Sequence, residues 1–223
     1  MQSPRLHSLR WVALVAATLA VGCATEEPTV KPSPVDPQVI AQSRSALTTS
    51  LKDTRNTAIK VKDQSSATIT ALDRLVDPKQ TDLKSAYDSF AKAVAALDSE
   101  AATMKTMAGK VSSDGQKFLS SWQQDLGSYA NKDVKEEGAS RHKEVVESFT
   151  DTQSNLDKTL GSVSELQVLL GDVKKYLGNA LSPEGVEQIS SVAGDARKSS
   201  EKLAKLIDST AESIDSLVNE LPS

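Results

Sequence analysis

Apolar side chains recur along most of this chain at alternating steps of three and four residues, a spacing that predicts long helices. The repeat is strictest between residues 83 and 129, and a strand or a loop would not produce it. Asp114 and Gly115 form a dipeptide that often makes turns, but the heptad phase continues unchanged across it. One helix is therefore expected over residues 79–131. Its seam positions are Leu83, Tyr87, Phe90, Val94, Leu97, Ala101, Met104, Ala108, Val111, Gly115, Phe118, Trp122, Leu126 and Tyr129.

A preceding helix is expected over residues 37–76. Asp36 is a good N-cap and Pro37 suits the first helical position. The helix should end at Asp77, because the residue before a proline avoids helical geometry. Many of its seam positions are small or carry a hydroxyl group, which predicts close but weak packing. These positions are Leu47, Leu51, Thr54, Ala58, Val61, Ser65, Thr68, Leu72 and Leu75.

Two more helices are expected, over residues 135–180 and 183–221. Residues 131–133 are the only plausible turn before the helix over residues 135–180. Ser182 as N-cap and Pro183 at the first helical position should start the helix over residues 183–221. Four helices of similar length with short connections favour an all-α fold, an elongated antiparallel four-helix bundle or coiled coil. Two alternatives stay open: a hairpin of the second and third helices with the others loosely packed, and an intermolecular coiled coil.

The first residues of the chain have the order of a secretory signal peptide. Arg5 and Arg10 precede the apolar run from Trp11 to Val21, which is about half the ~20 residues needed to span a membrane. Cys23, the only cysteine, follows directly. We therefore expect residues 1–22 to be a lipoprotein signal peptide and Cys23 to carry the lipid, with an ordinary signal peptide as the alternative.

Residues 23–36 contain three prolines and no apolar period, and they are expected to form a lipidated tether. Residues 37–223 then form the helical domain. Ala24, rather than an aspartate, follows the cysteine. This favours an outer-membrane anchor with the protein on the periplasmic face.

The charge of the processed chain argues against two kinds of partner. Loss of residues 1–22 leaves 24 of the 26 basic side chains against 30 acidic ones, a net charge of −6. No basic face remains to neutralise phosphates, so no nucleic-acid partner is expected. Electrostatic binding to anionic lipid is equally disfavoured.

Residues that carry chemistry are scarce. His142 is the one histidine outside the predicted signal peptide, and its charged neighbours place it on an expected solvated face. One histidine supports neither a zinc site nor a catalytic triad. We therefore expect no metal, no cofactor and no enzymatic activity. The best candidate site is the aromatic group Phe118, Trp122 and Tyr129. Its ordinary interpretation is core packing, and the alternative is a partner-docking patch near the turn at residue 131.

Phe118-Leu119, Trp122, Leu126 and Tyr129, together with the helix end over residues 173–181, resemble the bacterial family called domain of unknown function 2959. Members are secreted or lipid-anchored helical proteins of about this length. The resemblance covers nearly the whole processed chain, and residues 118–181 carry most of it. The family implies a fold and a location, and it implies no activity.

These features together predict a periplasm-facing lipoprotein that acts as a structural or interaction module, a spacer or adaptor. Its partners would be the membrane, through the lipid anchor, and another envelope protein. The alternative is a helical carrier or chaperone-like binder of an apolar ligand or client, with the first helix as its gate.

Overall fold

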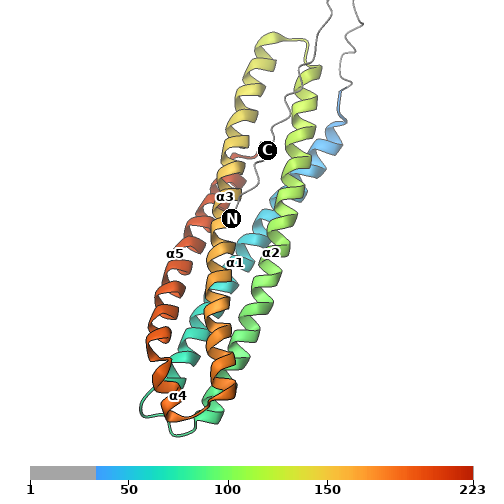
Figure 1. Cartoon of the computed structure of the whole chain (residues 1–223). Coiled ribbons are helices and arrows are strands. Elements are labelled where there is room, and N and C mark those ends of the chain that lie inside the picture. Colours follow the sequence, from blue (N-terminus) through green and yellow to red (C-terminus); the bar gives the residue numbers. More distant parts are fainter. Residues whose placement is uncertain (1–33, 223) are drawn as a thin grey trace, which may run out of the picture. The chain divides into compact units, whose positions relative to one another are not determined.

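The computed structural model describes residues 34–222, which are almost entirely helical (Figure 1). No strand occurs between these two residues, so the predicted all-α fold class is confirmed. No helix in the described part of the chain is long and apolar enough to cross a membrane. The predicted signal peptide, Cys23 and most of the tether lie outside the described residues. The helices are α1 (Pro37–Leu75), α2 (Leu83–Ser128), α3 (Lys132–Asn179), α4 (Pro183–Gln188) and α5 (Ser190–Glu220).

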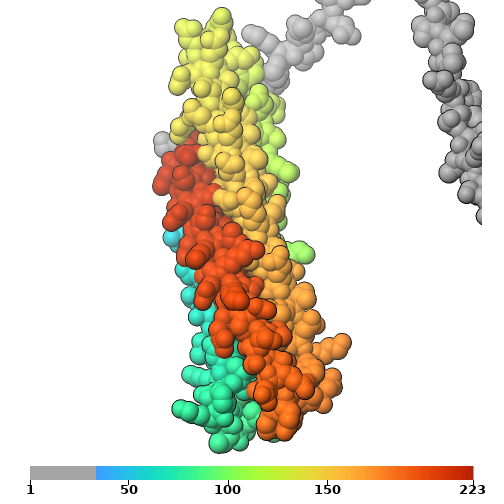
Figure 2. Space-filling model, turned by 60° about the vertical axis from the view of Figure 1, so that its left-hand side comes forward, coloured from blue at the N-terminus to red at the C-terminus, as the bar shows by residue number. Residues whose placement is uncertain are grey.

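The four long helices form a helical bundle in which each packs against two others. α1 contacts α2 and α5, and α3 contacts α2 and α5, with the most extensive contact between α1 and α2. Figure 1 shows that the long helices α1, α2, α3 and α5 run in alternating directions along the bundle. Figure 2 shows α5 lying along α3 on one face of the bundle.

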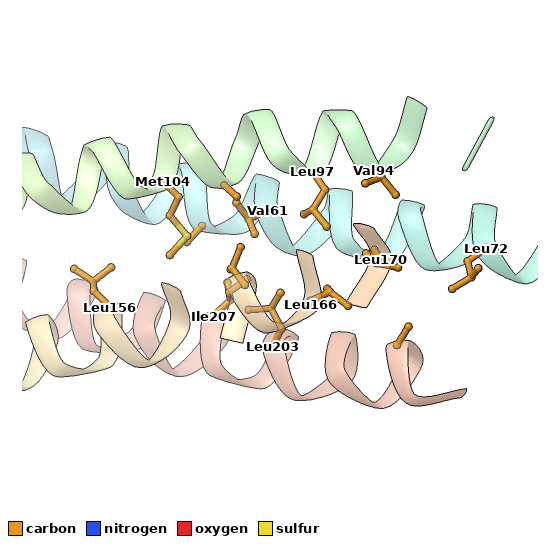
Figure 3. Close-up of a cluster of buried hydrophobic side chains, with 14 of the residues drawn as sticks. Val61, Leu72, Val94, Leu97, Met104, Leu156, Leu166, Leu170, Leu203 and Ile207 are labelled. Carbon is orange, nitrogen blue, oxygen red and sulfur yellow. The ribbon is translucent and has the colours of Figure 1, made fainter. Parts of the chain in front are cut away.

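The core consists of the heptad positions that the sequence predicts. All nine predicted seam residues of α1 are buried, and the seam of α2 is buried from Phe90 to Phe118 except at Ala108, which is half-buried. Val61, Met104, Leu166 and Ile207 point toward one another from the four long helices (Figure 3). Burial of such side chains contributes about 1.5–3 kcal/mol each.

Pairs of hydroxyl groups join α5 to its two neighbours, and all members are buried except the half-buried Ser200. The hydroxyl oxygens are 2.9 Å apart in the pair Thr159–Thr210 and 2.7 Å apart in the pair Ser65–Ser200. A buried hydroxyl is costly without a hydrogen-bond partner. These positions therefore tolerate polar residues inside an apolar seam because the polar groups meet across helices.

The connection between α1 and α2 is longer than the sequence indicated. α2 begins at Leu83 rather than at residue 79, because side chains satisfy the backbone of the preceding residues. Asp77 accepts a hydrogen bond from the Lys79 N–H at 2.9 Å, and Gln80 accepts one from the Asp82 N–H at 2.9 Å. Asp82 is the N-cap. As predicted, α2 continues without interruption through Asp114 and Gly115.

The other end of α2 and the start of α3 also differ from the expected bounds. α2 ends at Ser128 rather than 131, and α3 begins at Lys132 rather than 135. Asn131 is the reason, because its side chain accepts a hydrogen bond from the Val134 N–H at 3.0 Å and so caps α3. The turn is therefore only three residues long, from Tyr129 to Asn131.

The prediction of one continuous helix over residues 183–221 was wrong at Ile189. α4 ends at Gln188 and α5 begins at Ser190, so Ile189 lies between the two helices. The Ile189 N–H donates to the Val186 carbonyl three residues back, which tightens the turn locally. Both Val186 and Ile189 are buried. The break therefore allows Val186 of α4 and Ile189, which lies between the two helices, both to point into the core.

Candidate functional site

The α2–α3 hairpin extends beyond the start of α1 and the end of α5, the two helices that pack against it along the rest of the bundle (Figures 1 and 2). The end of α5 is fixed by two arginines: Arg141 donates to the Glu220 carbonyl at 2.8 Å, and Arg44 donates to the Pro222 carbonyl at 2.6 Å. Cations at a helix C-terminus complement its dipole. Between Arg141 and the α2–α3 turn, α2 and α3 pack mainly against each other. We call residues 119–142 the hairpin tip.

The two helices of the hairpin tip pack closely against each other at Leu126 and Gly138. Leu126 of α2 is buried although the flanking helices have ended, because it lies against Gly138 of α3. A Cβ at position 138 would be 2.5 Å from Leu126 Cδ2, closer than real atoms approach. The absence of a side chain at Gly138 thus allows Leu126 to pack against the α3 backbone and closes the tip.

The three residues of the predicted aromatic patch lie in three different environments. Phe118 is fully buried and belongs to the core, as the ordinary interpretation expects. Trp122 is half-buried, with its ring centroid 5.6 Å from that of Phe118. Tyr129 is 42% exposed beyond the end of α2. Only Trp122 and Tyr129 are therefore available to a partner.

The prediction that His142 lies on a solvated face was wrong. Its ring is half-buried and edge-on to Trp122, with centroids 5.1 Å apart and planes at 81°. Its Nε2 lies 3.0 Å from the Leu119 carbonyl oxygen, which only accepts, so Nε2–H donates. The charged neighbours of His142 concealed this contact, because its partners lie on the other side of the turn.

Exposed apolar side chains concentrate at this end of the bundle. Three of the five exposed large hydrophobic residues in the described chain are here: Val39 at 47%, Tyr129 at 42% and Val134 at 52%. The Tyr129 hydroxyl donates to Asp125 at 2.9 Å. This hydrogen bond, followed by burial and by the charge of Asp125, raises the pKa of Tyr129 above its usual 10.0. The hairpin tip therefore exposes an aromatic and an apolar side chain, Tyr129 and Val134, among charged residues.

The polar groups of the hairpin tip are engaged within the tip itself. Its polar side chains hydrogen-bond locally, as Tyr129 does to Asp125 and His142 to Leu119. Within residues 34–222 no three His, Cys, Asp or Glu side chains come together in a way that would hold a metal ion.

Comparison with known proteins places the chain in a family. A family model described as "Protein of unknown function (DUF2959)" matches residues 38–221, which include nearly all of α1 to α5. The chain belongs to this family. The resemblance seen in the sequence is thereby confirmed, and the family description carries no activity with it. No curated protein and no solved structure matches the chain.

The opposite end of this DUF2959 protein holds a pocket that the sequence did not indicate. It has a volume of about 400 Å³ and lies between the α1–α2 connection and α4. Val76, Leu83 and Val186 supply apolar walls, and Asp77 and Glu187 supply two carboxylates. The pocket depends on the late start of α2 and on the break at Ile189, and neither feature has a signature in the heptad pattern.

Proposed function

We propose that this DUF2959 protein is a bacterial lipoprotein, held at the periplasmic face of the outer membrane by lipid on Cys23. The helical domain acts there as a non-enzymatic spacer or adaptor for another envelope protein. The order of residues 1–23, with basic residues, a short apolar run and a single cysteine, supports the anchor.

We infer an up-down-up-down antiparallel four-helix bundle for the domain. The ring of contacts from α1 to α2, α3 and α5 and back to α1 supports this topology. The 46 residues of α2 give the body a length of roughly 70 Å at 1.5 Å per residue. A body of this length, tethered at one end, suits a spacer.

The observation that carries the adaptor proposal over the carrier alternative is the packing of α1. A carrier with α1 as its gate would need this helix to separate easily from the bundle. Instead, its whole predicted seam is buried, and its contact with α2 is the most extensive between any two helices described. Gln64 and Thr68 also donate hydrogen bonds to the Ala93 carbonyl of α2, at 3.1 and 3.2 Å. Opening the bundle at α1 would break all of these contacts.

A partner is best accommodated along the face shared by α3 and α5. Val168 is 64% exposed there, in a shallow groove between the two helices. Three carboxylates line the same groove: Glu165, Asp172 and Asp195. An apolar centre with an acidic rim suits a partner surface that is apolar with basic residues around it.

The carrier alternative retains one specific support, the pocket of about 400 Å³ beside α4. This volume falls in the usual range for small-molecule sites, about 300–1,000 Å³. It suits a small ligand and not an unfolded client.

Fractionation of cells that produce Cys23→Ser tests the anchor. The wild-type protein should sediment with membranes, and the variant should move to the soluble fraction. Ala24→Asp is the matched variant for location, since it keeps the lipid and should shift the protein from outer to inner membranes on a density gradient. An unchanged distribution of Cys23→Ser would contradict the proposal.

Photo-crosslinking in intact cells tests the adaptor role. A photoreactive residue at position 168 should join the protein to one discrete envelope protein. The same probe at Gly109, an exposed position of α2, is the control. Absence of any protein adduct at position 168, or the same adducts at both positions, would contradict the role assigned to this face.

A further inference from the structure

We propose that the hairpin tip is a membrane-contact surface that rests in the head-group region of the bilayer holding the lipid of Cys23. This inference rests on the proposed function, because it takes the anchor at Cys23 as given. It adds a second, weaker contact and a defined orientation of the bundle on the membrane.

The connection between Cys23 and the bundle determines which end faces the bilayer. The bundle begins at Pro37, about 14 residues after Cys23, and these residues span at most about 50 Å when fully extended. Figure 1 shows that α1 starts at the end of the bundle from which the hairpin tip projects. A lipid on Cys23 is therefore tethered to the end of the bundle from which the tip projects, and the tip projects beyond the start of α1.

The side chains at this end are of the kind found at membrane–water interfaces. Trp and Tyr are enriched there because an apolar ring lies below a polar group. Tyr129 is exposed and Trp122 half-buried, and Val39 and Val134 add exposed apolar surface. The α4 end has one exposed large hydrophobic residue, Tyr176, which is hydrogen-bonded to Gln188.

The charged side chains of the hairpin tip nearly balance, so the tip can approach a bilayer closely without a preference for anionic lipid. The tip contains three basic and four acidic side chains: Lys132, Lys135, Arg141, Asp125, Asp133, Glu136 and Glu137. Attraction to a charged surface is therefore small. Contact must come from apolar burial, which is weak for so few residues. The tether makes the encounter intramolecular and raises the effective concentration of the surface, so weak contact suffices.

For one reason, we favour a bilayer over another protein or a second copy of this chain as the surface that the hairpin tip contacts. The bilayer is brought to this end by the chain itself, whereas nothing in the described residues directs another protein there. A protein at the tip is therefore one of the outcomes that the test must distinguish.

Fluorescence of Trp122 tests the inference directly. The chain has two tryptophans, and Trp11 is lost with the signal peptide, so Trp122 is the only one in the processed protein. The processed chain is coupled through Cys23, its only thiol, to maleimide-bearing lipid in phosphatidylcholine vesicles. Coupling of this kind does not depend on lipidation in cells. Acyl-chain bromination of the phosphatidylcholine should quench Trp122 emission relative to unbrominated vesicles.

Two variants separate contact at the tip from general proximity to the bilayer. The double variant Tyr129→Asn/Val134→Lys should lose the quenching while the protein remains coupled and folded. Val168→Lys changes an exposed valine of α3, the helix that also carries Val134, at a position far from the tip. Quenching should persist in this variant. Anionic phosphatidylglycerol in place of part of the phosphatidylcholine should leave the wild-type result unchanged.

Equal Trp122 emission in brominated and unbrominated vesicles would overturn the inference and leave the anchor proposal untouched. Equal quenching of the wild-type protein and the double variant would overturn it as well. Crosslinks from position 134 to another protein or to a second copy, without quenching, would replace the bilayer by that partner. Failure of the anchor itself would show separately, as unchanged fractionation of Cys23→Ser in cells.

Discussion

The ring of Phe149 on α3 lies directly on Gly115 of α2, so close that a Cβ at position 115 would overlap the ring. Gly115 is buried in the middle of the longest apolar seam of the chain, where a glycine weakens a helix by roughly 0.5–1 kcal/mol relative to alanine. The absence of a side chain is what allows the phenyl ring to reach the α2 backbone. The helix thus loses some intrinsic stability, and the interface between α2 and α3 gains a closely packed aromatic side chain.

Gly115→Ala should therefore destabilise the bundle although alanine is the better helix former. Overpacking of this kind costs about 1–3 kcal/mol. The control is Gly109→Ala, six residues earlier on α2, where an added Cβ meets nothing within 4 Å. That variant should be neutral or stabilising by roughly 0.5–1 kcal/mol. Urea unfolding followed by circular dichroism gives both values, and equal signs for the two changes would contradict the packing described here.

The hydroxyl pair Thr159–Thr210 should show strong coupling between its two members. Both residues are buried, and each hydroxyl is the main partner of the other. Thr159→Val or Thr210→Val alone leaves a buried hydroxyl with one longer hydrogen bond to a carbonyl, 3.3 Å for Thr210 and 3.5 Å for Thr159, at a cost of about 1 kcal/mol. Replacement of both removes the unsatisfied group, so the double variant should be more stable than the sum of the single changes indicates. Additive effects in a double-mutant cycle would show that the pair contributes nothing as a pair.

The heptad pattern predicted the long helices and most of their buried positions, because both depend on local periodicity. Asp36 and Ser182 were also predicted correctly as N-caps, since capping depends on one side chain and the next few N–H groups. Gly115 was assigned to the seam, but its function is to accommodate Phe149, which is distant in the sequence. A periodic pattern shows which face of a helix is buried and not which side chain lies opposite.

The candidate site was predictable only in part for the same reason. Trp122 and Tyr129 were found as aromatic residues near a turn. Val134 and Val39 were not, because their exposure matters only once α1 and α5 are seen to stop short of the hairpin tip. His142 was missed because its contacts with Trp122 and Leu119 cross the turn.

His142→Ala should expose Trp122 to water. The substitution removes an edge-on ring contact and a hydrogen bond to the Leu119 carbonyl, together worth about 1–2 kcal/mol. In a chain that begins at Cys23, where Trp122 is the only tryptophan, its emission should shift to the red and become more accessible to iodide. Lys143→Ala is the control, because the neighbouring lysine makes only an exposed ion pair with Glu147 at 3.8 Å. A red shift of the same size in both variants would show that His142 does not cover the indole.

The hydrogen bond from Tyr129 to Asp125 gives the hairpin tip a measurable pH dependence. Because the pKa of Tyr129 is raised in the folded protein, the folded state holds this proton more tightly than the unfolded state. The associated stability is therefore fully present below pH 10.0 and is lost as the pH rises through the raised pKa. Asp125→Asn removes the charge and weakens the acceptor, so the pKa of Tyr129 should fall toward 10.0.

Absorbance at the tyrosinate band follows this titration in a background in which Tyr87→Phe and Tyr176→Phe remove the other two tyrosines. Asp133→Asn is the matched control, because it removes a carboxylate of the hairpin tip that makes no hydrogen bond to Tyr129. The Asp125→Asn curve should move to lower pH while the control curve stays with the wild type. Coincidence of all three curves would mean that Tyr129 is free of Asp125 in solution, and the tyrosine hydroxyl would then be open to another acceptor.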